Sequence, residues 1–112
     1  MDSQRLLLLF AYPCLLGVGQ LLFKLSVRNS SSSMLEVLIS PLFLFAVAFY
    51  GGLTVLWIWI LKAVPLSRAY PFVALSFLIT PLLGVVVLDE PLGRFFWWGG
   101  GLIVAGIVFV VL

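Results

Sequence analysis

The chain has 112 residues, of which 64% are hydrophobic and only 9% are charged, with a formal net charge of +2. Soluble domains carry about 25% charged residues, so this composition excludes an ordinary soluble domain. The basic residues are scattered over the ends of apolar segments, which argues against nucleic acid binding. The chain has no histidine and a single cysteine, Cys14, which argues against a metal site.

Four apolar segments, each at least 18 residues long without a formal charge, make up most of the chain. Such a segment can cross a bilayer core of about 30 Å as a helix, and backbone groups in lipid must be satisfied within the segment. We therefore predict an all-α membrane protein whose residues 1–112 form one domain. It is an antiparallel bundle with short loops and transmembrane helices at about 6–25, 37–61, 68–88 and 94–112.

The first segment places polar and small residues on one helix face. Pro13, Gly17, Gln20 and Lys24 follow one another at spacings of 4, 3 and 4 residues. One interpretation is a packing stripe, with Lys24 reaching up to the membrane interface. The other is the wall of a cavity, where Lys24 attracts an anion and Gln20 donates a hydrogen bond.

The connection Ser26–Leu35 is rich in serine and is predicted to be a flexible surface loop. In the second segment, Tyr50 and Thr54 lie one helical turn apart. Trp57 and Trp59 lie near the end of that segment, where aromatic side chains anchor a helix at the membrane interface.

The third segment combines a stripe of small residues with two prolines. Ser76, Thr80 and Gly84 are spaced four residues apart, and Pro71 and Pro81 each remove a backbone hydrogen bond. The prolines predict a hinge at or near these positions. A break of this kind is either a mobile element of the type found in transporters or a static kink.

The fourth segment is rich in small residues that allow close approach of helices. Its predicted role is packing in the dimer or within the bundle, through Gly99, Gly101, Ala105 and Gly106. Four thin helices rarely enclose a translocation path, which favours a dimer. Each side of the predicted membrane has three basic side chains, so the positive-inside rule gives almost no orientation. Either both chain ends are cytoplasmic, or the protein inserts both ways round and forms an antiparallel dimer.

The stretch from Val64 to Pro71 resembles the loop and third-helix start of the small multidrug resistance proteins, within the EamA-like drug/metabolite transporter superfamily. The multidrug branch has a membrane-embedded glutamate in its first helix, shared by protons and cationic substrate. The matching position here is Leu16. The Gly-x-Gly hinge of that branch reads Leu75-Ser76-Phe77 here.

A second branch shares more of the chain. Gly19-Gln20 with Lys24, Ala69-Tyr70-Pro71 and the Glu90-Pro91 turn resemble the four-helix subunits of the undecaprenyl phosphate-aminoarabinose flippase, which work in pairs. The resemblance implies a translocator, not an enzyme, that moves a polyprenyl-phosphate-linked sugar or related anionic lipid across the bacterial inner membrane. It implies no cofactor, and either a homodimer, antiparallel in one arrangement, or a heterodimer with a related four-helix subunit.

Two other functions stay open from the sequence. One is export of cationic drugs or metabolites in the manner of the small multidrug resistance proteins. The other is a membrane subunit without transport activity that stabilises a glycosyltransferase or a larger permease.

The flippase interpretation implies roles for the polar residues of all four segments. Basic side chains near the segment ends can hold phosphate, and hydroxyl and amide groups can bind a sugar. The implied substrate-binding residues are Gln20, Lys24, Arg68, Tyr70, Ser76 and Thr80; Arg28 and Arg94 hold lipid phosphate at the interface, and Glu90 and Pro91 form the loop turn.

Overall fold

The computed structural model describes residues 3–28 and 33–112. Within these ranges the chain is α-helical and contains no strand, as the sequence predicts. The helices are α1 (Ser3–Arg28), α2 (Met34–Ile39), α3 (Pro41–Ala63), α4 (Leu66–Val73), α5 (Ser76–Leu88) and α6 (Phe96–Val111).

Three stretches of the described chain are long and apolar enough to cross a membrane: α1, α3, and α4 with α5 taken together. Helix α6 has 16 residues, a length of about 24 Å at 1.5 Å per residue. It is shorter than the fourth segment predicted over about 94–112, because Arg94 and Phe95 lie in the turn that precedes it. Large apolar side chains are exposed on all of these helices, as expected of surfaces that face lipid.

Helix α1 is longer than the sequence predicts. It continues through Ser26 to Arg28, and the Ser26 hydroxyl donates a hydrogen bond of 2.7 Å to the carbonyl of Phe23. The prediction of a loop was therefore wrong at this end, and also at Met34 and Leu35, which begin α2. Residues 29–32 of the predicted loop lie outside the described residues.

The second segment, predicted as one helix over about 37–61, is interrupted at Ser40. This residue has an extended backbone (φ −67°, ψ 143°), and its side chain accepts a hydrogen bond of 3.2 Å from the Phe43 N–H. Pro41 disfavours a helical conformation for the residue before it and suits the first turn of α3. Ser40 and Pro41 therefore end α2 and begin α3.

The third segment is interrupted between its two prolines, at Ala74 and Leu75. The N–H groups of these residues bond to the carbonyls of Pro71 and Phe72, each at 3.1 Å. These hydrogen bonds span three residues, as in a 3₁₀ turn, and they end α4. Helix α5 then continues through Pro81. The break follows Pro71 by one turn, Pro81 lies inside α5, and the hinge role of the two prolines stays a prediction.

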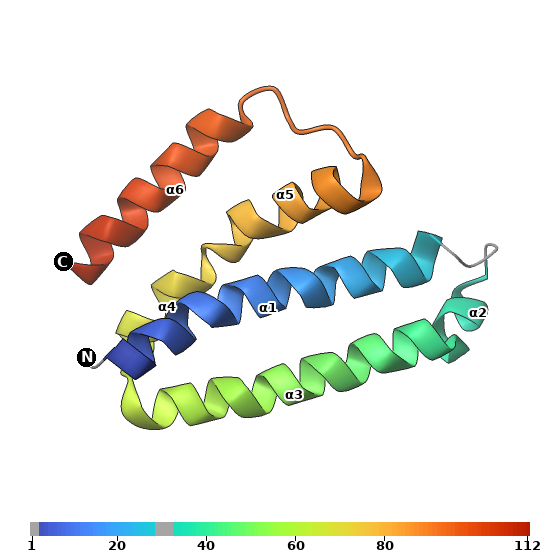
Figure 1. Cartoon of the computed structure of the whole chain (residues 1–112), viewed down its shortest axis with the longest axis horizontal. Helices are drawn as coiled ribbons and strands as arrows, with labels where there is room; N and C mark the ends of the chain where they lie inside the picture. The colour runs from blue at the N-terminus through green and yellow to red at the C-terminus, as the bar shows by residue number, and fades with distance from the viewer. Residues whose placement is uncertain (1–2, 29–32) are drawn as a thin grey trace.

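Helix α1 is the centre of the arrangement. It lies between α3 on one side and α4 with α5 on the other, and α3 runs antiparallel to it (Figure 1). The two ends of the chain lie at the same end of the molecule in this view. Helix α6 packs against α4 and lies on the side away from α3 (Figure 1).

The buried core lies near the first half of α1. The Tyr12 and Trp57 rings stack with centroids 5.0 Å apart, and the rings of Phe10 and Phe72 meet edge-on at 5.3 Å. The core residues are Leu9, Tyr12, Leu53, Ile60, Val64, Ala69 and Phe72. These contacts tie α1, α3 and α4 together at the end of the molecule where the chain begins.

Glycines allow the close approach of helices at three places. A Cβ at Gly17 would lie 3.1 Å from Ile79 and Leu83 of α5, and one at Gly19 would lie 2.5 Å from the Tyr50 ring of α3. In α6 the packing glycine is Gly100, where a Cβ would lie 2.7 Å from Leu78.

The other small residues of α6 do not pack within the described chain. Gly99, Gly101 and Gly106 have no neighbour within 4 Å of a built Cβ, and Ala105 is exposed. Gly99 and Gly101 therefore make no close helix contact within the described chain. Packing in a dimer stays a prediction.

Candidate functional site

A pocket of 250 Å³ lies between α1 and α5, at the opposite end of the bundle from the buried core. Helix α1 contributes Gln20, Leu21 and Lys24, α5 contributes Thr80, Gly84 and Leu88, and the following turn contributes Glu90. The pocket therefore joins the polar face predicted for the first segment with the stripe of small residues predicted for the third. Gly17, one turn from Gln20, lets the two helices approach closely.

The polar face of α1 is fixed from its other side by α3. The Gln20 side-chain N–H donates a hydrogen bond of 2.6 Å to the Tyr50 hydroxyl, and Tyr50 packs against Gly19. The Tyr50 ring also lies 5.1 Å from the Phe23 ring. These contacts hold the Gln20 amide at the pocket wall and limit its rotation.

A turn at the end of α5 brings a carboxylate into the pocket. Asp89 adopts a left-handed conformation (φ 56°, ψ 31°), which asparagine and aspartate tolerate better than most residues. The Glu90 N–H then bonds to the Gly84 carbonyl at 3.2 Å. A Cβ on Gly84 would lie 2.8 Å from Oε1 of Glu90, so this glycine leaves room for the carboxylate over α5.

The Glu90 carboxylate forms an ion pair with Lys24, with 3.7 Å between Oε2 and Nζ. The two side chains are 47% and 54% exposed. Exposed pairs of this kind contribute about 0–1 kcal/mol, so a ligand can open this one at little cost. The pocket thus offers a cation, a carboxylate, an amide and a hydroxyl to one small polar group.

The pocket reaches from the end of α5 into the bundle. Thr80 and Leu88 both line it and are eight residues apart, or about 12 Å along the helix axis. Its volume lies below the range of about 300–1,000 Å³ typical of sites for drug-sized molecules. A site of this size suits the head group of a lipid whose tail stays outside the bundle.

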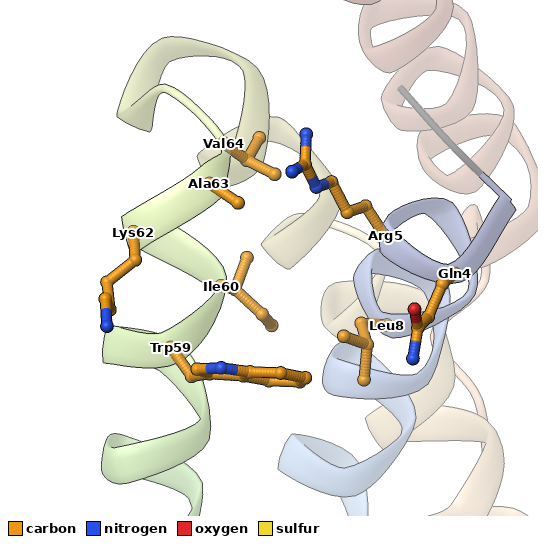
Figure 2. Close-up of a pocket in the computed structure, with 8 residues that line it drawn as sticks. All are labelled: Gln4, Arg5, Leu8, Trp59, Ile60, Lys62, Ala63 and Val64. Atoms are coloured by element: carbon orange, nitrogen blue, oxygen red, sulfur yellow. The ribbon is translucent and has the colours of Figure 1, made fainter.

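A second hollow of 350 Å³ lies at the other end of the molecule, between the start of α1 and the end of α3. Figure 2 shows the Trp59 indole extending towards Leu8, and the Arg5 side chain reaching towards Val64. Lys62 also lines this hollow, and its ammonium points away from α1 (Figure 2). Apolar side chains form most of its wall, and it contains none of the residues that the sequence predicts to bind substrate.

The structure brings together Gln20, Lys24 and Thr80 of the predicted substrate-binding residues and separates the rest from them. Arg68 is exposed on α4, at the other end of the bundle. Tyr70 and Pro71 line a largely apolar groove between α4 and α6, and the Tyr70 ring meets the Trp57 ring edge-on. Ser76 begins α5 and does not line the pocket.

The predicted interface residues lie on the same side of the molecule as the pocket. Arg28 is the last residue of α1, one turn beyond Lys24, and it is exposed. The Arg94 guanidinium lies 5.3 Å above the centre of the Phe95 ring, at the start of α6. Pro91 is exposed in the turn after Glu90.

Sequence reasoning missed two contributions to the site. It placed Glu90 in a loop turn without a ligand role, and it gave Tyr50 no partner. The contact between Glu90 and Lys24 could have been predicted, because these opposite charges lie at the same membrane edge of an antiparallel bundle. The contact between Gln20 and Tyr50 left no comparable signal.

Comparison with known proteins identifies relatives of the whole chain. The EamA-like transporter family matches residues 3–112. A protein of Pectobacterium atrosepticum, named a probable 4-amino-4-deoxy-L-arabinose-phosphoundecaprenol flippase subunit, is 36% identical over 105 residues, which are 89% of this chain and 92% of the relative. A protein of the same name from Aeromonas salmonicida is 31% identical over 104 residues, which are 89% and 91% of the two chains.

A shorter match is more similar in sequence. A Klebsiella pneumoniae protein of the same name is 45% identical over 53 residues, which are 47% of each chain. No solved structure matches. The membrane-length helices and these relatives together indicate a multi-pass membrane transporter, and the chain belongs to the EamA-like transporter family.

Proposed function

We propose that this chain translocates a polyprenyl-phosphate-linked sugar, or a related anionic lipid, across the bacterial inner membrane. The observation that carries the proposal is the small polar pocket between α1 and α5, where Lys24, Gln20 and Thr80 meet beside exposed apolar helix faces. The full-length relatives named as flippase subunits supply the substrate class.

Each pocket residue has a chemical role in this proposal. Lys24 pairs with the phosphate, because an ammonium forms strong charge-assisted hydrogen bonds with phosphate oxygens. The Gln20 amide and the Thr80 hydroxyl bind sugar hydroxyl groups. The apolar tail stays in the lipid, so only the head group must leave water and enter the bundle.

Export of cations in the manner of the small multidrug resistance proteins is less well supported. That mechanism needs a carboxylate in the first helix, and no Asp or Glu lies between Ser3 and Arg28. The nearest carboxylate of the pocket, Glu90, lies beyond the end of α5 and is already paired with Lys24.

The decisive experiment measures lipid flipping in proteoliposomes. The chain is purified from membranes with any subunit that stays bound to it, and it is reconstituted with a fluorescent polyprenyl-phosphate 4-amino-arabinose, the sugar that the relatives' names specify. A membrane-impermeant reductant then quenches the probe in the outer leaflet only. We expect protein to expose probe from the inner leaflet, and Lys24→Ala to slow this by about tenfold or more, the effect of losing one charged hydrogen bond.

The matched control is Lys62→Ala, which removes the same charge from the opposite end of the bundle. Lys62 does not line the pocket between α1 and α5, and we expect wild-type flipping. Equal probe exposure with and without protein would show that the chain does not flip this lipid.

We further propose that the chain works with a second four-helix subunit, either identical or related, that packs on α6. The exposed Gly99, Gly101 and Ala105 support this proposal, because small side chains without neighbours allow a second helix to approach closely. Disulfide cross-linking of an Ala105→Cys variant in membranes measures this contact directly.

A further inference from the structure

The charges of the pocket occur as a pair, and the pair restricts the head group that can bind. Lys24 is the only cation that lines the pocket among the described residues, and the Glu90 carboxylate lies 3.7 Å from it. We infer that the pocket selects a zwitterionic head group, with Lys24 binding the phosphate and Glu90 binding an ammonium group on the sugar. This inference rests on the proposed function of the same pocket.

A purely anionic head group fits the pocket poorly. A phosphate that binds Lys24 competes with Glu90 for the same ammonium, and it lies close to the Glu90 carboxylate. Like charges at this separation repel one another, and Glu90 loses its own partner. A sugar that carries an ammonium supplies a new partner for Glu90, so the exchange leaves every charge paired.

The backbone keeps Glu90 at the pocket. The left-handed Asp89 and the hydrogen bond from the Glu90 N–H to the Gly84 carbonyl direct the side chain back over α5. The absence of a side chain at Gly84 lets Oε1 lie against the helix, while Oε2 faces Lys24. Such a turn holds the carboxylate in the pocket that Thr80 and Gln20 also line.

The charge pattern of the relatives' named substrate agrees with this geometry. Their names specify an arabinose with an amino group at carbon 4 and a phosphate link to the lipid. A single sugar ring separates the two charged groups. Glu90 therefore provides the contact by which the pocket distinguishes the free amine from the same sugar with its amine blocked.

The test compares two synthetic probes with the same short polyprenyl phosphate: one carries 4-amino-arabinose, and the other carries its N-acetyl derivative, which has no positive charge. Binding to the protein in detergent is measured by native mass spectrometry. We expect the wild type to bind the amine about tenfold more tightly, the effect of one charged hydrogen bond. Glu90→Gln should bind the two probes within about threefold of each other, with weaker binding of the amine.

Asp89→Asn is the matched control, because it removes a carboxylate from the same turn at a residue that does not line the pocket. We expect it to keep the wild-type preference. Equal wild-type binding of the two probes, or an unchanged preference in Glu90→Gln, would overturn the inference.

Flipping of the same two probes separates this inference from the proposed function. If the wild type flips both probes at the same rate, the inferred selectivity is wrong and the proposed translocator function is supported. If it flips neither, the proposed function itself is wrong. If it flips the amine faster and Glu90→Gln removes the difference, both proposals hold.

Discussion

The contact between α1 and α3 at Gly19 makes a sharp prediction about stability. A methyl group at this position would lie 2.5 Å from Cε2 and 3.0 Å from Cδ2 of the Tyr50 ring. These distances are shorter than van der Waals contact, and a ring packed between helices has less freedom to move than the end of a flexible chain. In Gly19→Ala, either Tyr50 rotates away or α1 and α3 separate.

The size of the effect follows from two terms. Overpacking a close contact costs about 1–3 kcal/mol. Displacing Tyr50 also breaks its 2.6 Å hydrogen bond with Gln20, a loss of about 0.5–1.5 kcal/mol. Replacing glycine by alanine within a helix offsets part of this, because it contributes about 1 kcal/mol of helix stability.

Gly51→Ala is the matched control, since Gly51 lies on α3 with no atom within 4 Å of a built Cβ. The gain in helix propensity is the same in both variants and cancels in the comparison. We expect Gly19→Ala to be less stable than Gly51→Ala by about 1.5–4.5 kcal/mol, the sum of the overpacking and hydrogen-bond terms. The measurement is unfolding by sodium dodecyl sulfate in mild detergent micelles, followed by circular dichroism. Equal stability of the two variants would refute the packing of Tyr50 on Gly19.

Two further predictions concern the carboxylate and the subunit contact. Gly84→Ala should displace the Glu90 carboxylate from α5 and reduce flipping of the amino-sugar lipid as Glu90→Gln does. Its stability should change little, because the end of a flexible side chain can move. Unchanged flipping would argue against the position of Glu90. In a Cys14→Ala background, Ala105→Cys should give a disulfide-linked product of about twice the monomer mass. Gly52→Cys, at the exposed middle of α3, should not give this product. The same yield from both variants would exclude a specific α6 contact.

Much of the helical content could be predicted from the sequence, because long apolar runs in lipid must satisfy their backbone hydrogen bonds as helices. Apolar composition does not report where those bonds are interrupted. The break at Ser40 had a readable signal, since a serine before Pro41 both caps a helix and adopts an extended backbone. The break at Ala74 and Leu75 follows Pro71 by one turn, and proline positions alone do not specify these two residues.

The candidate site was predicted in part. The spacing of Gln20 and Lys24 placed them on one face of α1, and the spacing of Thr80 and Gly84 placed them on one face of α5. That these two faces meet is a finding of the structure and does not follow from helical periodicity. The position of Glu90 depends on a single left-handed residue in a turn, and the length of an apolar segment carries no information about it.

The central claim is that the head group passes through the Lys24 pocket, and flipping rates of two lysine variants test it most directly. In proteoliposomes with the same amount of protein and probe, the account predicts that Lys62→Ala flips polyprenyl-phosphate 4-amino-arabinose at the wild-type rate. Lys24→Ala should be slower by about tenfold or more. Equal rates for the two variants, both above protein-free vesicles, would contradict the claim and place the path elsewhere in the bundle.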